Sequence, residues 1–301
     1  MANNSSTITL ISLVRGGEPV QYRVSSERLN GGTGPIVVIS MVDDSKFVLK
    51  APLDASRRQL VLRNAHEANE YLAFQLYRAA GCRVPDYIDF VQIEGTDIYG
   101  ILENFIDGVT LYDLMSERDP HIKELTFPAI RNDLIIHALF ANWDINVTQN
   151  IMIARIVNEN GTRSYDYSNP ITIDCGGTLQ FRALGGLKDF SSEVANINSI
   201  VRYSAHYKPM GLFQSFSRKD LTTEICKRWA TVNKDAILRA FDEVQEVIRP
   251  IFSSADLNVD YLRAVLMDRM TYIDGLCTAK NSKKGGSTRR RKYHRRSKTR
   301  K

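Results

Sequence analysis

The chain has 301 residues, 43% hydrophobic and 25% charged, so it can bury a substantial core in one two-lobed domain or two small ones. Its net charge of +6 is uneven, because residues 281–301 carry eleven Lys and Arg and no acid, leaving 29 basic and 34 acidic residues before them. No apolar run reaches the roughly 18 residues that span a bilayer, and Met1–Val14 lacks the features of a signal peptide. We therefore expect an intracellular protein, in the cytoplasm, the nucleus or a virion.

The first 105 residues are predicted to form a small antiparallel sheet with one helix. Short β-branched runs separated by glycine or polar turns are typical of strands. Helical spacing replaces them from Arg57 to Ala80, and Gly81 ends the helix. The six predicted strands are Ile8–Val14, Val20–Val24, Ile36–Met41, Lys46–Leu49, Tyr87–Ile93 and Ile98–Phe105.

Residues 106–280 are predicted to be mainly helical, with a small β-hairpin in the middle. The helices are expected at Leu111–Ser116, at Phe127–Asn142 and repeatedly from Ser217 to Leu276, and the hairpin strands at Ile151–Val157 and Pro170–Asp174. A sheet with one helix followed by a helical part is the element order of kinase-like folds. We therefore predict an α+β, two-lobed, protein-kinase-like fold, with an N-lobe (1–105), a C-lobe (106–280) and a disordered basic tail (281–301).

The four cysteines are Cys82, Cys175, Cys226 and Cys277. None are arranged with CxxC spacing, and they fall in apparently different elements. We therefore expect buried or incidental thiols, with neither a zinc site nor a disulfide framework.

A glycine-rich run lies between two predicted strands and consists of Gly31, Gly32, Thr33 and Gly34. Backbone amides without bulky side chains can cover nucleotide phosphates, so this run is a candidate phosphate loop. The alternative is an ordinary turn, since the run lacks the full spacing of the protein-kinase glycine loop.

Lys50 ends a predicted strand, at the position where a kinase places the lysine that binds the α- and β-phosphates. Such a lysine needs a carboxylate partner, and Glu67 and Glu70 both follow about twenty residues later in the predicted helix. We favour Glu70 as the partner. Farther on, Glu103 and Phe105 lie where the chain crosses to the helical part, and we expect this hinge to contact adenine through its backbone.

Two short motifs carry the remaining candidate site residues. In Asn142-Trp143-Asp144 we expect Asp144 to orient the acceptor hydroxyl, and Asn150 to supply an uncharged oxygen to magnesium. Asp174 ends an apolar strand before Cys175 and two glycines, and we expect it to be the main metal ligand. The spacing departs from the protein-kinase pattern, because no His-Arg precedes Asp144 and Asn150 is one residue farther on.

Together, these motifs resemble the atypical kinase-like proteins related to the HipA toxin kinases and, more distantly, to phosphatidylinositol kinases. The resemblance covers residues 28–280 and rests mainly on the Asn-Trp-Asp motif and on the Ile173–Gly177 segment. It implies ATP and Mg²⁺ as cofactors and transfer of phosphate to a hydroxyl. A protein Ser/Thr acceptor is favoured over a small molecule or lipid, and specificity is expected to lie in Thr178–Phe216.

The basic tail, Lys283–Lys301, is expected to contact nucleic acid or another anionic surface without sequence preference, or to act as a localisation signal. Its composition resembles tails on many proteins of giant DNA viruses. The rival interpretation of the whole chain is a noncatalytic pseudokinase, an interaction protein tethered to nucleic acid by this tail.

Overall fold

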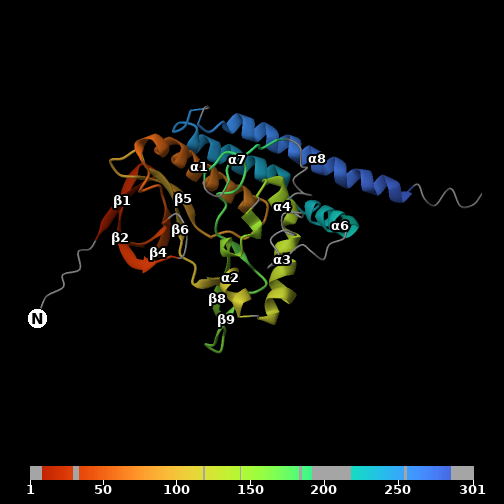
Figure 1. Cartoon of the computed structure of the whole chain (residues 1–301), viewed down its shortest axis with the longest axis horizontal. Coiled ribbons are helices and arrows are strands. Elements are labelled where there is room, and N and C mark those ends of the chain that lie inside the picture. The colour runs from red at the N-terminus through yellow and green to blue at the C-terminus, as the bar shows by residue number, and fades with distance from the viewer. Residues whose placement is uncertain are drawn as a thin grey trace, which may run out of the picture.

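The computed structural model describes residues 9–29, 34–117, 119–142, 144–182, 185–191, 218–253 and 256–285 (Figure 1). A β-barrel forms one side of the molecule and helices form the other, with the long helix α1 between the barrel and α7 (Figure 1). The barrel strands are β1 (Leu10–Arg15), β2 (Glu18–Arg28), β3 (Ile36–Ser40), β4 (Lys46–Lys50), β5 (Ile88–Ile93) and β6 (Tyr99–Asn104).

The antiparallel pairing predicted for the N-terminal part is present, but the sheet closes into a barrel in the order β1-β2-β3-β4-β6-β5. Closure occurs because β1 pairs with β2 on one side and with β5 on the other, where Leu13 lies opposite Ile93. Inward-facing side chains fill the barrel with a small core of its own: Leu13, Tyr22, Val38, Leu49, Val91 and Leu102. A closed barrel leaves no free strand edge, so this part of the chain is a compact unit.

Helix α1 (Arg57–Ala79) ends as predicted at Gly81, whose φ of +78° suits glycine at the end of a helix. Its apolar face is buried at Ala68, Leu72 and Leu76, which have no exposed surface. Several polar side chains of the same helix are also buried, namely Asn64, His66, Asn69 and Glu70. Buried polar groups need partners, and those of α1 find them in both halves of the molecule.

The chain after residue 107 contains short elements followed by three long helices. Its elements are β7 (Gly108–Thr110), α2 (Leu111–Ser116), the π-helical turn η1 (Ile122–Thr126), α3 (Phe127–Asn132), α4 (Leu134–Leu139), the 3-10 turns η2 (Asp144–Asn146) and η3 (Thr148–Asn150), β8 (Ile151–Val157), β9 (Arg163–Tyr165), β10 (Ile171–Thr172), α6 (Arg218–Trp229), α7 (Lys234–Ile248) and α8 (Val259–Gly285). Strand β8 pairs with β7, β9 and β10, and Thr172 lies opposite Ile151.

The single helix predicted over Phe127–Asn142 is wrong, because the helix breaks at Asp133. This residue leaves the helical region with φ −90° and ψ 7°, and its carboxylate accepts a hydrogen bond from Arg228 Nε at 2.8 Å. The break turns α4 toward the interior, where all six of its residues are buried.

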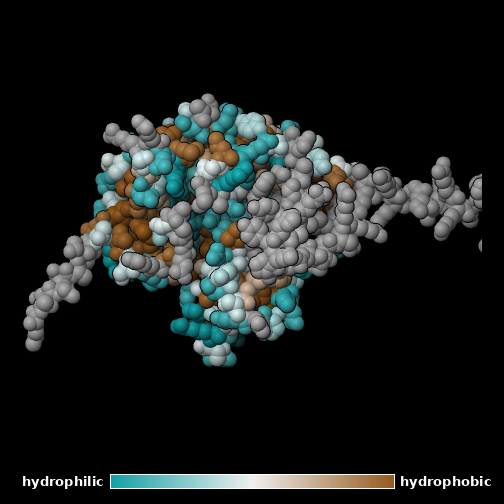
Figure 2. Space-filling model, in the orientation of Figure 1, coloured by the Kyte–Doolittle hydropathy of each residue, from teal (hydrophilic) through white to brown (hydrophobic). Residues whose placement is uncertain are grey.

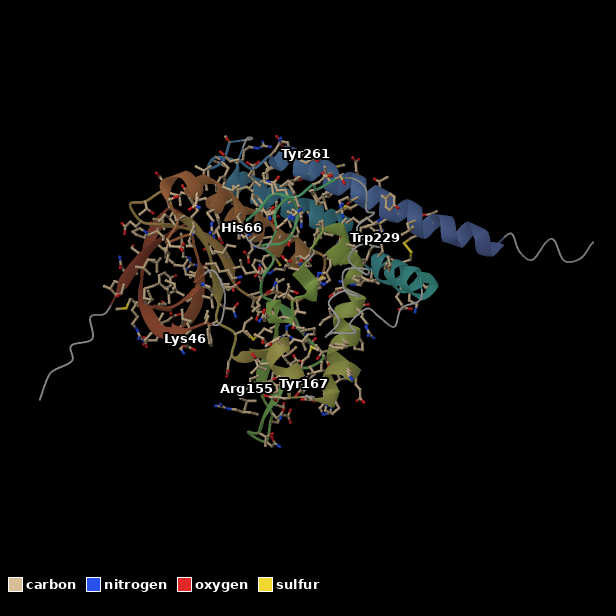
Figure 3. All side chains as sticks on the ribbon, in the orientation of Figure 1. Lys46, His66, Arg155, Tyr167, Trp229 and Tyr261 are labelled. Atoms are coloured by element: carbon tan, nitrogen blue, oxygen red, sulfur yellow. A yellow bond between two sulfur atoms is a disulfide. The ribbon has the colours of Figure 1, made fainter. Side chains whose placement is uncertain are left out.

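The expectation of unpaired cysteines is also wrong for two of the four. Cys226 of α6 and Cys277 of α8 form a disulfide, with their Cα atoms 5.4 Å apart (Figure 3). Cys82 and Cys175 are buried free thiols, as expected. The pair could not be predicted from local patterns, because 51 residues separate the two cysteines and the packing of α6 beside α8 brings them together.

Hydrophobic residues gather on the visible surface of the barrel, whereas hydrophilic residues cover β8 and β9 (Figure 2). Across the residues described, no helix combines the length and the apolar character needed to cross a membrane. Helix α8 continues to Gly285, so the first residues of the segment predicted to be a disordered tail are helical. Residues 286–301 lie outside the described residues.

Candidate active site

Lys50 lies where the barrel, α1 and the loop after β10 meet. Its Nζ donates hydrogen bonds to Glu70 Oε1 at 2.9 Å and to the backbone carbonyl of Ile173 at 2.5 Å. Glu70, the partner favoured from the sequence, therefore forms the ion pair, whereas Glu67 lies next to His66. Burial opposes the charge on Lys50, but the carboxylates of Glu103, Glu70 and Asp174 raise its pKa well above the ordinary value. Lys50 is therefore a charged ammonium group whose side chain is only 18% exposed.

The carboxylate of Glu103 is a second partner of Lys50 that the sequence analysis did not assign. Its Oε1 lies 3.4 Å from Lys50 Nζ, and its Oε2 is buried without a hydrogen-bond partner among the described residues. Burial raises the pKa of Glu103 to about 7, because one lysine cannot neutralise both glutamates and the neighbouring Asp174. The strand register accounts for this contact, since β6 pairs with β4 and places Glu103 opposite Val48, two residues before Lys50.

The backbone groups of the predicted hinge residues, Glu103 and Phe105, form hydrogen bonds within the protein. The N–H of Phe105 donates to the carbonyl of Lys46 at 3.1 Å, and Lys46 Nζ lies 5.2 Å from the centre of the Phe105 ring. Glu103 lies in a strand that pairs on both sides, with β4 and with β5. Contact between adenine and the backbone of these two residues stays a prediction.

The glycine-rich run falls mostly on residues 30–33, which lie outside the described residues. Gly34 is described, with φ +71° and open space around its α-carbon. It leads into β3, where Ile36 lies opposite Leu49, the residue before Lys50. Gly34 therefore lies at the same end of the barrel as Lys50.

Asp174 opens a tight loop against α1. Its Oδ1 accepts a hydrogen bond from the N–H of Gly176 at 2.9 Å, and the N–H of Cys175 points at Glu70 Oε1 at 3.4 Å. A Cβ on Gly176 would lie 2.9 Å from His66 and 3.2 Å from Glu70, so only glycine allows the loop to approach so closely. Asn150 lies beside this loop, because its carbonyl accepts the N–H of Ile173 at 3.0 Å.

Asp144 faces the same loop from the other side, at the start of η2. A Cβ on Gly177 would lie 1.7 Å from Asp144 Oδ2, so the carboxylate sits directly against the glycine backbone. Asp144 Oδ2 is buried and has no hydrogen-bond partner among the described residues. Burial and the nearby charge of Asp174 raise the pKa of Asp144. Trp143 lies outside the described residues.

Lys188, which the sequence analysis did not single out, joins these two loops. Its Nζ donates to the carbonyl of Ala141 at 2.5 Å and to the carbonyl of Gly177. Burial lowers the pKa of Lys188 to about 7, an effect that the charge of Asp144 partly offsets. Lys188 lies within the segment expected to carry specificity, where no motif could be assigned.

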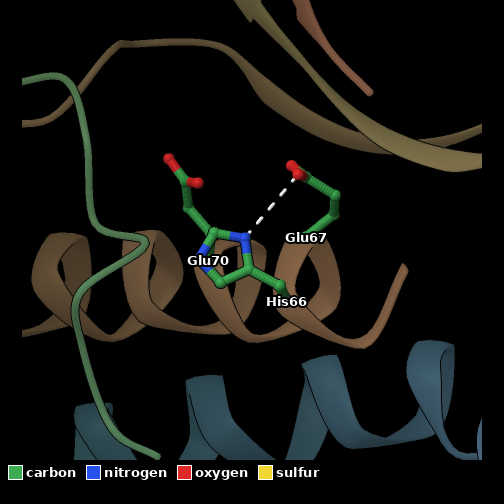
Figure 4. A group of neighbouring side chains, drawn as sticks. All are labelled: His66, Glu67 and Glu70. Carbon is green, nitrogen blue, oxygen red and sulfur yellow. Dashed lines mark ion pairs between the residues drawn. The ribbon is translucent and has the colours of Figure 1, made fainter. Parts of the chain in front are cut away.

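His66, Glu67 and Glu70 form a compact cluster on α1 (Figure 4). His66 Nδ1 lies 3.7 Å from Glu67 Oε1, and the ring meets Phe181 edge to face at 5.4 Å. The possible ligand atoms of His66, Glu67 and Glu70 lie within 4.8 Å of one another, a spacing that is compatible with a metal site. However, Glu70 already binds Lys50, so it is not free to bind a metal ion. The ring of His66 packs against Gly176 instead.

No protein-family model matches the chain, and no curated protein matches its sequence. Solved structures do match it. One is the crystal structure of a Helicobacter pylori proinflammatory kinase, CtkA, which is 13% identical and gives a TM-score of 0.52, with 86% of this chain and 95% of that chain covered. The fold is kinase-like. At this identity the similarity establishes the architecture alone.

Proposed function

We propose that the protein is an ATP- and Mg²⁺-dependent phosphotransferase that acts on a hydroxyl, with a protein Ser/Thr acceptor favoured. The observation that carries this proposal is the Lys50–Glu70 ion pair at 2.9 Å, held against the loop that contains Asp174. Kinases use such a lysine–glutamate pair to present a cation to the nucleotide phosphates. The motif resemblance to HipA-related kinases supports the same function.

The residues around this pair fit magnesium. Asp174 and Asn150 offer a carboxylate and an amide oxygen, the hard donors that Mg²⁺ prefers, and the backbone of Asn150 bonds to Ile173, the residue before Asp174. Asn150 and Asp174 would hold the ion, which when bound would neutralise charge on the phosphates.

The protein side chains then have distinct tasks. Lys50 binds the phosphates, and Glu70 fixes the direction of its ammonium group. Asp144 orients the acceptor hydroxyl and accepts its proton, a task that its burial favours because burial raises its pKa. Gly177 allows this carboxylate to stand directly against the metal-binding loop.

The test is incubation of the purified full-length protein with γ-labelled ATP and magnesium, alone and with a cell lysate, using the wild type and Asp144→Asn. The variant should bind ATP as the wild type does and lose roughly two to four orders of magnitude in turnover, the usual contribution of a positioned base. Asp86→Asn is a matched control, because Asp86 is exposed and lies outside the site.

Binding of magnesium and ATP without any turnover would instead support the noncatalytic pseudokinase. Equal losses of ATP affinity and of rate in Asp144→Asn would assign Asp144 to the metal ligands.

A further inference from the structure

A buried row of polar side chains runs from the back of the C-lobe to Asp144. The N–H of Asp144 donates to Asn142 Oδ1 at 2.9 Å, and Asn142 Nδ2 donates to the Tyr77 hydroxyl at 3.1 Å. The Tyr77 hydroxyl is 2.8 Å from His137 Nδ1. Tyr77, Asn142 and His137 are 0%, 1% and 3% exposed, so solvent does not compete for these bonds.

The direction of every bond in this row follows from its chemistry. Asn142 must present its oxygen to the N–H of Asp144, which leaves its NH₂ group for Tyr77. Burial raises the pKa of Tyr77 well above the ordinary value, so the hydroxyl keeps its proton. Burial also lowers the pKa of His137 to about 3, so the imidazole is neutral. Among the described residues His137 Nδ1 is the acceptor available to the hydroxyl, which places the imidazole proton on Nε2.

The backbone at the end of the row needs support. Ala141, the residue before Asn142, adopts φ +51°, which is unfavourable for a residue with a β-carbon. Such a conformation persists where surrounding contacts fix it. The N–H of Asn142 donates to the carbonyl of His137 at 2.8 Å, so the same histidine holds this turn through its backbone as well.

We propose that His137, Tyr77 and Asn142 are positioning residues that fix the turn at Asp144 for phosphotransfer. This inference rests on the proposed function. Each member orients the next, and the last bond fixes the N–H of the residue expected to handle the acceptor proton. This row of side chains includes residues of α1 and α4, so it also connects the helix that carries Glu70 to the loop that carries Asp144.

His137 can be reached chemically from behind the site. It lines a cavity of about 380 Å³ together with Cys82, Asp133 and Arg228, at the end of α1 and away from Lys50. Replacing His137 with alanine would enlarge this cavity by the volume of an imidazole. Free imidazole could then restore the missing acceptor.

The first experiment compares Tyr77→Phe with Tyr22→Phe, a matched loss of one hydroxyl from a buried tyrosine of the barrel core. Removing the Tyr77 hydroxyl leaves the Asn142 amide without its acceptor. We expect kcat to fall about tenfold or more, which equals roughly 1.4 kcal/mol of lost orientation. The KM for ATP should stay within about twofold, and the control should match the wild type. Unchanged kcat in Tyr77→Phe would overturn the proposal.

The second experiment is chemical rescue of His137→Ala. The variant should lose activity to a similar extent and recover most of it in millimolar imidazole, at concentrations that leave the wild type and Tyr77→Phe unchanged. A purely structural role would show as lost stability without rescue, and a folded variant that imidazole does not restore would overturn the role of His137.

Hydrogen exchange of the Asp144 amide separates failure of this inference from failure of the proposed function. If the wild type shows no phosphotransfer, the proposed activity fails, but faster exchange at Asp144 in Tyr77→Phe than in Tyr22→Phe would still support the positioning chain. Equal exchange in both variants would overturn the chain whether or not the protein is active.

Discussion

Glu103 leads to a prediction that runs against the usual effect of breaking an ion pair. Its carboxylate is 4% exposed and lies 3.4 Å from Lys50, which also binds Glu70. Two buried acids share one ammonium group, so one negative charge remains poorly compensated. We expect Glu103→Gln to stabilise the protein at neutral pH, because the amide can still accept a bond from Lys50 but carries no charge.

The magnitude follows from the pKa of Glu103, which burial raises from an ordinary value of 4.5 to about 7. The folded state therefore holds this proton more tightly than the unfolded state does. The stabilising contribution is complete below pH 4.5 and is lost as the pH rises through 7. Between pH 5 and pH 7.5 the loss is on the order of 2 kcal/mol.

The assay is guanidinium unfolding of the wild type and Glu103→Gln at several pH values from 5 to 7.5. His66 and Glu70 also have raised pKa values and are present in both proteins, but Glu70 shares Lys50 with Glu103, so the difference between the two curves reports the two glutamates together. The variant should gain stability relative to the wild type as the pH rises, by roughly 2 kcal/mol over this range. A variant that is less stable at pH 7.5 than the wild type would refute the reasoning.

Three further predictions concern separate parts of the chain. Gly177→Ala should lower turnover by about two orders of magnitude in steady-state kinetics, because its β-carbon would lie 1.7 Å from Asp144 Oδ2. The control, Gly186→Ala, should match the wild type, because Gly186 has open space around it. Cys226→Ser should lower the free energy of unfolding by up to about 4 kcal/mol, as expected for opening a 51-residue loop, and a reducing agent should remove this difference in guanidinium titrations. Deleting residues 281–301 should abolish binding to duplex DNA. For the full-length protein the log affinity should fall with log salt at a slope of roughly −5 if about six charges reach phosphates. Equal binding by the full-length and the truncated protein would contradict this.

Local sequence patterns predicted most elements of the fold. Strand β8 and helix α2 have the predicted bounds, and α1 ends at the predicted glycine, because strand and helix periodicity and glycine stops are local signals. Barrel closure was not predictable in this way, since it depends on Leu13 meeting Ile93, eighty residues along the chain. The break at Asp133 likewise depends on Arg228, a residue of a distant helix.

In the candidate site, too, some residues were predictable from the sequence and others were not. The ion pair between Lys50 and Glu70 was expected from the order of the motifs, and the structure contains it. Glu103 was expected to contribute its backbone, but its side chain points at Lys50 instead, because the register between β4 and β6 decides where it points. Lys188 lies in a segment without a motif, and its role follows only from two backbone carbonyls that the folded loops present to it.

The hydrogen bond from Lys50 to the carbonyl of Ile173 affects how inactive reference proteins should be chosen. Replacing the phosphate-binding lysine is a common way to obtain a kinase without activity, on the assumption that only a charge is lost. Under the proposed function Lys50 would bind the phosphates, and the structure shows that its ammonium group also joins the barrel to the loop that carries Asp174. A Lys50 variant would therefore loosen the contact between the barrel and this loop. It would also weaken the binding of any partner that recognises the surface formed by both. Asp144→Asn preserves that joint and is the better reference for separating catalysis from binding.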